Sequence, residues 1–385
     1  MTGEPTLRCR PNSTTMNDEM PNLDFLRAIA VLLVVASHLA YYFGLMDIGA
    51  FRIIRTGALG VLFFFVHTCC VLMMSLERQW RRQTPLKLFG SFITRRIFRI
   101  YPLSITVVIL IAIFHLPQEA VLPGRFQSAS LSAATIFSNL TLLHVSGQWV
   151  LGVLWSLPYE MAMYLLLPWI FLFVFAHRTC WRIGALWLVA VVGSILILEI
   201  LKWPHRDYFC EYVPCFLPGI IAFQLRRTRR RRQFPAPLWI GTILSVVPVY
   251  MYRLDLFGNY RFTNWLICLV IGVAIPFFGQ ISQRWIAAPS RYVAKYSYGI
   301  YLTHFFCIWL AFEQLHHLLA KVARVGVFVV LVAGLPIVFY HLVEEPMILV
   351  GKRWAKSFEM AYESWIESRT MAGVPMCCRW LLRVR

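Results

Sequence analysis

The stretch LDFLRAIAVLLVVASHLAYYFG, residues 23–44, is long and apolar enough to cross a bilayer, yet it carries Arg27 and His38. An ionisable residue at the centre of a membrane helix costs about 2.5 kcal/mol or more. The two side chains lie eleven residues apart, nearly three helical turns, so they share one helix face and are separated by about 16.5 Å along the axis. This face predicts a polar interior inside a membrane protein.

The composition is that of a polytopic membrane protein. Of the 385 residues, 59% are hydrophobic and 14% are charged, against about 25% charged in a typical soluble domain. Runs near 20 apolar residues predict an all-α fold with about ten transmembrane helices. These are residues 25–43, 57–76, 100–116, 155–176, 181–201, 209–225, 236–253, 264–281, 296–315 and 325–343. A short extra helix is expected near Leu131–Leu143.

Lysine and arginine placement predicts the orientation. With a cytoplasmic N-terminus, 27 of the 37 lysines and arginines fall in cytoplasmic segments and nine in outer connections. Both termini are therefore predicted to be cytoplasmic, in a multi-pass protein of the inner (plasma) membrane. Residues 1–22 would form a cytoplasmic segment, 23–346 the membrane domain, and 347–385 a cytoplasmic amphipathic tail at the membrane surface.

The basic residues that produce the net charge of +19 lie between the apolar runs, as in RRTRRRRQ at residues 226–233. Such basic blocks stop transfer across the membrane and contact anionic lipids. We therefore expect membrane lipids, and no nucleic acid, as partners of this charge.

A carboxylate, Glu160 in WSLPYE, is expected at the depth of His38. Each lies five residues from the outer end of its predicted helix, about 7.5 Å below the surface. The two would face one cavity and pair, with the carboxylate fixing the tautomer of the imidazole. In the alternative interpretation they make separate polar contacts, with Arg27 as a lipid anchor and His38 as a packing residue.

A third cluster, FITRRIFRIYPL at residues 92–103, places Arg95, Arg96 and Arg99 at the cytoplasmic mouth of the third predicted helix. Arg96 and Arg99 share a face by their spacing of three. Arginines bind phosphates in bidentate fashion, although topogenic anchoring fits the same pattern. The histidines do not cluster at metal-ligand spacing, so no metal is expected.

Together these motifs resemble the acyltransferase 3 family of integral membrane acyltransferases, which includes O-antigen and exopolysaccharide O-acetylases. The resemblance covers roughly residues 20–346. The matching elements are Arg27-x(10)-His38, RIFRIYP at 96–102, WSLPYE at 155–160, SYGIYLTH at 297–304 and EEP at 344–346. One element departs: in GVLFFFVHTCC from Gly60, Thr68 replaces a serine, Cys69 replaces a glycine, and His67 is extra. Glycine permits close helix approach, so this departure bears on helix packing or donor fit.

The resemblance implies acyl-CoA, usually acetyl-CoA, as a co-substrate from the cytoplasmic side, with no further cofactor. The acceptor would be a hydroxyl of a cell-envelope or exported glycan. His38 would act as general base assisted by Glu160, or as a transient acyl carrier. The residues expected to hold the CoA phosphates are Arg27, Arg96 and Arg99 with Arg95, and those expected to line the channel are Thr68, Trp155, Ser156, Tyr301 and His304.

Two alternatives stay open. Within the enzyme class, the acceptor could instead be a small secreted metabolite or a lipid. From another class, a proton-coupled transporter would also place ionisable residues in the membrane and break a helix, as Pro214 and Pro218 do in residues 209–225. The lack of repeat halves argues against the transporter.

Overall fold

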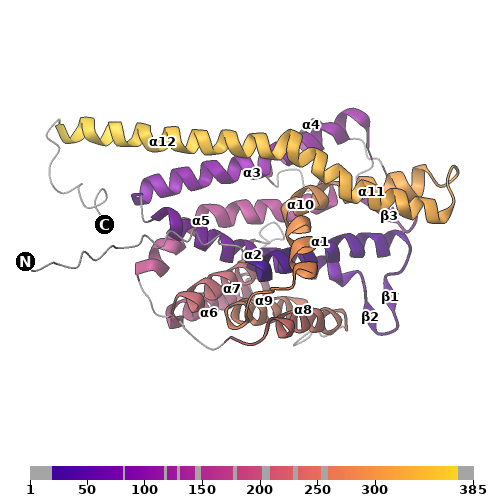
Figure 1. The fold of residues 1–385 in the computed structure, drawn as a ribbon, viewed down its shortest axis with the longest axis horizontal. Coiled ribbons are helices and arrows are strands. Elements are labelled where there is room, and N and C mark those ends of the chain that lie inside the picture. Colours follow the sequence, from indigo (N-terminus) through magenta and orange to yellow (C-terminus); the bar gives the residue numbers. More distant parts are fainter. Residues whose placement is uncertain are drawn as a thin grey trace, which may run out of the picture.

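The computed structural model describes residues 20–80, 83–116, 119–127, 131–143, 149–176, 180–201, 209–228, 233–252 and 259–371. It is an all-α bundle (Figure 1). The α-helices are α1 (Pro21–Tyr42), α2 (Arg55–Trp80), α3 (Pro85–Phe114), α4 (Ala133–Thr141), α5 (Leu157–Ala176), α6 (Cys180–Ile195), α7 (Phe209–Thr228), α8 (Ala236–Met251), α9 (Tyr260–Ala274), α10 (Arg284–Ile308), α11 (Lys321–Phe339) and α12 (Glu345–Met371).

Short elements connect or extend these helices. A 3₁₀ turn, η1 (Gly152–Ser156), leads into α5, and η4 (Ile275–Phe277) ends α9. The π-helical segments η2 (Leu196–Ile200), η5 (Trp309–Gln314) and η6 (Tyr340–Glu344) follow α6, α10 and α11. Two antiparallel hairpins, β1 (Asp47–Ile48) with β2 (Phe51–Arg52) and β3 (Glu119–Leu122) with β4 (Arg125–Gln127), follow α1 and α3.

All ten predicted spanning segments fall on helices, namely α1, α2, α3 and α5 to α11, and α4 covers the predicted short helix. Seven helical stretches are long and apolar enough to cross a membrane, among the described residues. The multi-pass all-α architecture is thereby confirmed. The count of ten crossings and the cytoplasmic placement of the termini stay predictions, and residues 229–232 of the basic run at 226–233 lie outside the described residues.

The predicted start of the third helix, residue 100, is wrong, because α3 begins at Pro85. Its early turns are held by α12, which runs along α3 in Figure 1. Lys87 binds Glu363, and Arg95 binds Glu359 at 3.1 Å. Of the predicted amphipathic tail, residues 347–371 belong to helix α12, which packs on α3 and continues α11 through η6, whereas residues 372–385 lie outside the described residues. The placement of this tail at the membrane surface stays a prediction.

Helix α2 is the centre of the bundle. In its most apolar window 72% of residues are buried, against 11% in α6, which lies at the periphery. It packs on α1, α7 and α9. A Cβ added to Gly60 would lie 2.4 Å from the carbonyl of Ala30 on α1, so the glycine permits the close crossing of α1 and α2.

The unusual Cys69 is accommodated from the other side of α2. Here α7 supplies the small residue: a Cβ at Gly219 would lie 2.2 Å from the carbonyl oxygen of Val66 and 2.8 Å from the Cβ of Cys69. A cysteine on α2 therefore packs where a glycine on α7 leaves room. The presence of Cys69 in place of a glycine is therefore compatible with close packing of α2 on α7, because Gly219 leaves the room.

We expect Gly219→Ala to destabilise the protein by roughly 1–3 kcal/mol, because the added methyl overpacks the α2–α7 crossing. Gly241→Ala on α8 is the matched control, since a Cβ there meets nothing within 4 Å. Thermal unfolding in detergent measures both. Equal melting temperatures for the two variants would contradict the tight crossing.

Candidate active site

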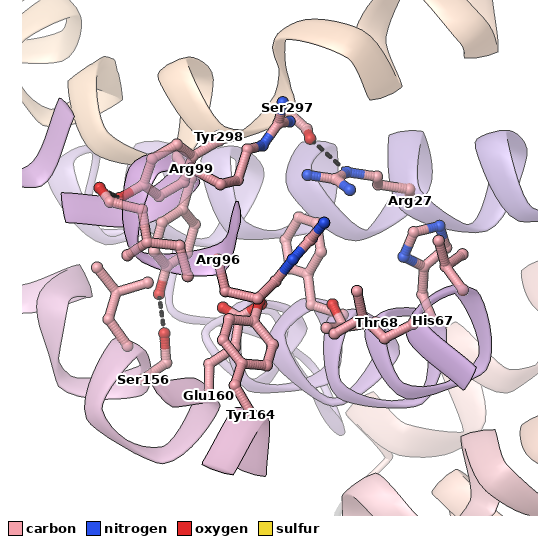
Figure 2. A pocket seen from close by; sticks show the side chains of 16 residues that line it. Arg27, His67, Thr68, Arg96, Arg99, Ser156, Glu160, Tyr164, Ser297 and Tyr298 are labelled. Carbon is pink, nitrogen blue, oxygen red and sulfur yellow. Dashed lines mark hydrogen bonds between the residues drawn. The ribbon is translucent and has the colours of Figure 1, made fainter. Parts of the chain in front are cut away.

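Five helices line a partly open polar cavity, shown in Figure 2 and called here the arginine cavity; its space, the mouth included, is about 700 Å³. It lies between α1, α2, α3, α5 and α10. The lining side chains are Arg27, Phe64, His67, Thr68, Val71, Leu72, Arg96, Arg99, Ile100, Ser156, Leu157, Glu160, Tyr164, Ser297, Tyr298 and Tyr301. Residues separated by up to 274 positions in the sequence, from Arg27 to Tyr301, thus meet in one site.

Three arginines of the sequence analysis converge here. Arg27 donates from Nε to Ser297 Oγ at 2.6 Å, and Arg99 lies 3.9 Å from the buried Glu344. The Nε of Arg96 is buried and makes no hydrogen bond to any described residue. Glu160 also lines the cavity and accepts a hydrogen bond from Tyr164.

The charges of this cluster do not cancel. Three guanidinium groups face two carboxylates, Glu160 in the wall and Glu344 behind Arg99. The excess is positive, and Arg96 keeps an unused donor. Because guanidinium groups match the geometry of phosphate and carboxylate oxygens, the cavity is suited to an anionic ligand.

Arg95 does not belong to this site, and its predicted role with the other three arginines is wrong. It binds Glu359 on α12 at 3.1 Å and Gln79 on α2 at 3.1 Å. These two contacts direct the Arg95 side chain toward α12 and α2, away from the cavity. It helps to hold α12 against α3 instead.

A second cavity, of about 570 Å³, contains His38 and is called here the histidine cavity. Its lining residues are Val34, Ser37, His38, Ile54, Gly57, Ala58, Val61, Val153, Trp155 and Tyr301. The His38 ring packs against Phe305, with 4.5 Å between ring centroids. Its Nδ1 lies 3.0 Å from Nε2 of His304, which is fully buried on α10.

The predicted pairing of His38 with Glu160 is wrong, because the two side chains line different cavities. The prediction that Glu160 and His38 lie at equal depth required residue 155 to lie at the membrane surface. Instead the chain enters η1 through buried residues, with Val150 and Leu154 each 0% exposed. Helix α5 therefore starts inside the protein, and Glu160 lies with Arg27, Arg96 and Arg99 rather than beside His38.

The hydrogen bonds of the two histidines define a tautomer. His304 Nδ1 lies 3.1 Å from the carbonyl of Ile300, which can only accept, so Nδ1 carries the proton. In the neutral ring, Nε2 of His304 then accepts from Nδ1 of His38, whose N–H also points to the Val34 carbonyl at 3.0 Å. The free lone pair of His38 is therefore on Nε2.

Tyr301 separates the two cavities, since it lines both. Its hydroxyl donates to the carbonyl of Val153 at 2.7 Å and accepts from Ser156 at 2.9 Å. Adjacent residues of η1 face opposite ways, with Trp155 in the histidine cavity and Ser156 in the arginine cavity. The partition thus consists of one tyrosine and one turn of 3₁₀ helix.

The family of the protein follows from comparison with known proteins. Residues 20–342 match the profile described as an acyltransferase domain, of the acyltransferase 3 family. The chain belongs to this family. It carries the acyltransferase domain of this family over residues 20–342, which favours acyl transfer over the transporter alternative.

One relative in the acyltransferase 3 family is the peptidoglycan O-acetyltransferase OatA of Listeria monocytogenes serovar 1/2a. It is 26% identical over 321 residues, which cover 74% of this chain and 49% of that protein. The chain thus spans about half the length of this relative. No solved structure matches the chain.

The acyltransferase 3 elements divide between the two cavities. Arg27, Arg96 and Glu160 are in the arginine cavity, and His38 is in the histidine cavity. The element at 297–304 joins them, through Ser297, Tyr301 and His304. Thr68 lines the arginine cavity as expected for a channel residue, whereas His304 contacts His38 behind the cavity wall.

Several residues in or next to the arginine cavity were not predicted from the sequence. Tyr164 follows Glu160 by four positions, a spacing that places both on one helix face and was a readable signal. Ser297 and Glu344 stood in recognised motifs but carried no assigned role. Among the described residues, no three His, Cys, Asp or Glu side chains gather as metal ligands, and a metal-free site stays a prediction.

The tautomer of His38 gives a direct test. Nitrogen-15 NMR on histidine-labelled protein should show Nδ1 protonated and Nε2 unprotonated, with His38→Gln identifying the signals. His304→Phe should lower the share of this tautomer, because only the Val34 carbonyl then holds the Nδ1 proton. Protonation of Nε2 in the unaltered protein would contradict the arrangement.

Proposed function

We propose that this protein transfers an acyl group, in the first instance acetyl, from cytoplasmic acyl-CoA to a hydroxyl of a cell-envelope glycan. Its family and its similarity to a peptidoglycan O-acetyltransferase support the reaction class. The observation that carries the proposal is the pair of cavities on either side of Tyr301, one lined by three arginines and the other by His38.

The arginine cavity is the proposed donor site. CoA carries phosphates at one end and its thioester at the other, so the two ends need different surroundings. Arg27, Arg96 and Arg99 would hold the phosphates, and Arg27 lies about 16.5 Å from His38 along α1. The pantetheine arm would then extend past Tyr301, over roughly half of the ~30 Å hydrocarbon core.

His38 is the proposed base. Its Nε2 takes the proton of the acceptor hydroxyl, whose oxygen bonds to the thioester carbonyl carbon. The carbon–sulfur bond then breaks, and the departing CoA thiolate takes the proton back from the imidazolium. His304 positions the ring by accepting from Nδ1, the part first assigned to Glu160. Glu160 instead offsets the charge of the arginines before the donor binds.

A second route through the same lone pair is a covalent one. Nε2 of His38 would attack the thioester, release CoA, and pass the acyl group to the acceptor in a second step. Mass spectrometry after incubation with acetyl-CoA and no acceptor separates the routes. An acetyl group on His38 indicates the carrier, and its absence from a preparation that transfers acetyl once acceptor is added indicates the general base.

We expect His38→Ala to lower acyl transfer by at least ~10²-fold, because the reacting end loses its base. CoA binding should be nearly unchanged, since the arginine cavity stays intact. Transfer from acetyl-CoA to glycan fragments and calorimetry in nanodiscs measure the two properties. His304→Gln should keep more transfer than His304→Phe, because its amide oxygen can still accept. Full transfer by His38→Ala would overturn the assignment.

Arg27→Ala should weaken CoA binding by about tenfold or more, the loss expected for a hydrogen bond to a charged group. Arg27→Lys should restore binding only in part, since an ammonium cannot make bidentate contacts. Arg95→Ala is the control, because its side chain binds Glu359 outside the cavity. Equal CoA affinity in the Arg27 and Arg95 variants would leave Arg27 with a structural role alone, through its hydrogen bond to Ser297.

A further inference from the structure

His67 is the residue of the arginine cavity that the proposed mechanism does not use. It lies on α2 and is 4% exposed, beside Arg27 and Thr68 in Figure 2. The ring lines the cavity, yet its Nδ1 is buried and makes no hydrogen bond to any described residue. A titratable, hydrogen-bonding side chain is therefore held at the donor site without a protein partner for that atom.

Such an arrangement is costly for the empty protein. An unpaired buried polar group destabilises a structure by roughly 1–3 kcal/mol, and native proteins contain few of them. The two positions before it on α2 are apolar, with Phe65 and Val66 each buried. A leucine at position 67 would match this surrounding better. The imidazole therefore favours a partner that arrives with a ligand.

The charges of the cavity indicate the chemistry of that partner. His67 stands beside Arg27, and the side chain of Arg96, whose buried Nε makes no hydrogen bond to any described residue, lines the same cavity. An oxygen that accepts from an arginine and from an imidazole N–H together is most favourable when it is anionic. A phosphate oxygen meets this requirement, and several oxygens on one group allow all three side chains to donate.

We propose that His67 is a donor-binding residue of this protein, one that hydrogen-bonds a phosphate oxygen of acyl-CoA together with Arg27 and Arg96. The inference rests on the proposed function, since it takes acyl-CoA as the donor. Position 67 is one at which the chain departs from the family pattern, and the inference gives this departure a role in binding the donor. The arginine cavity of this chain would thus hold four phosphate-binding side chains, Arg99 included.

The test compares His67→Leu and His67→Gln with the unaltered protein in nanodiscs, using CoA as the probe. His67→Leu should bind CoA about tenfold more weakly, and His67→Gln should lose less, because its amide can donate. Without ligand, His67→Leu should melt at the same temperature or higher, since the unpaired ring nitrogen is gone. Weaker binding with equal or greater stability is a combination that a packing role does not produce.

His341→Gln is the matched control, because that histidine binds Glu345 outside the cavity. CoA affinity of His67→Leu equal to that of this control would overturn the inference. So would a lower melting temperature of the ligand-free His67→Leu protein with unchanged affinity, which indicates packing. Pantetheine, which lacks phosphates, should bind His67→Leu and the unaltered protein alike; an equal loss for both probes would place the contact elsewhere and overturn the phosphate assignment.

The same experiment separates this inference from the proposed function. If the unaltered protein fails to bind CoA, the donor assignment is overturned, and the role of His67 falls with it. If the unaltered protein binds CoA and Arg27→Ala weakens that binding while His67→Leu does not, the donor assignment stands and the inference alone fails.

Discussion

The bundle is organised around charges that must not face lipid. An arginine in the hydrocarbon core is costly unless other groups of the protein surround it. Arg27, Arg96 and Arg99 come from two different helices, and their neighbours Ser297, Glu160 and Glu344 come from three further segments. Solvating the three guanidinium groups therefore requires α1, α3, α5, α10 and η6 to converge on one place.

Helix α2 makes this convergence possible. It is the most buried of the apolar helices, and it approaches α1 at Gly60 and α7 opposite Gly219. Both crossings are close because one partner lacks a Cβ. The three positions at which the chain departs from the family pattern follow one another on this helix. Cys69 packs against the glycine of α7, while His67 and Thr68 face the cavity.

The two cavities differ in the charge of the side chains that line them. One gathers excess positive charge, and the other is lined by His38, whose ring contacts His304 and Phe305 behind the cavity wall. The wall between them is thin, built from Tyr301 and the η1 turn, whose neighbouring residues face opposite sides. A long substrate with a charged end and a reactive end fits such a division, since each end meets its own surroundings. His304 completes the second cavity by giving His38 a defined tautomer without adding a charge to the membrane interior.

By itself the sequence determined the helical architecture and the family. A chain in lipid must satisfy its backbone hydrogen bonds within each segment, so apolar runs of sufficient length read directly as helices, and all ten predicted segments proved helical. Local spacing also placed Arg96 and Arg99 on one face, and the motifs named most of the cavity residues. The tertiary structure alone decided the partners. Glu160 does not pair with His38, because α5 starts inside the protein. Arg95 binds Glu359 on α12, and His304 contacts His38 although the two lie 266 positions apart in the sequence. The depth of a side chain in the bundle and the neighbour that it faces depend on where the chain enters the bundle and on which helices cross. Neither property can be read from a local stretch of sequence.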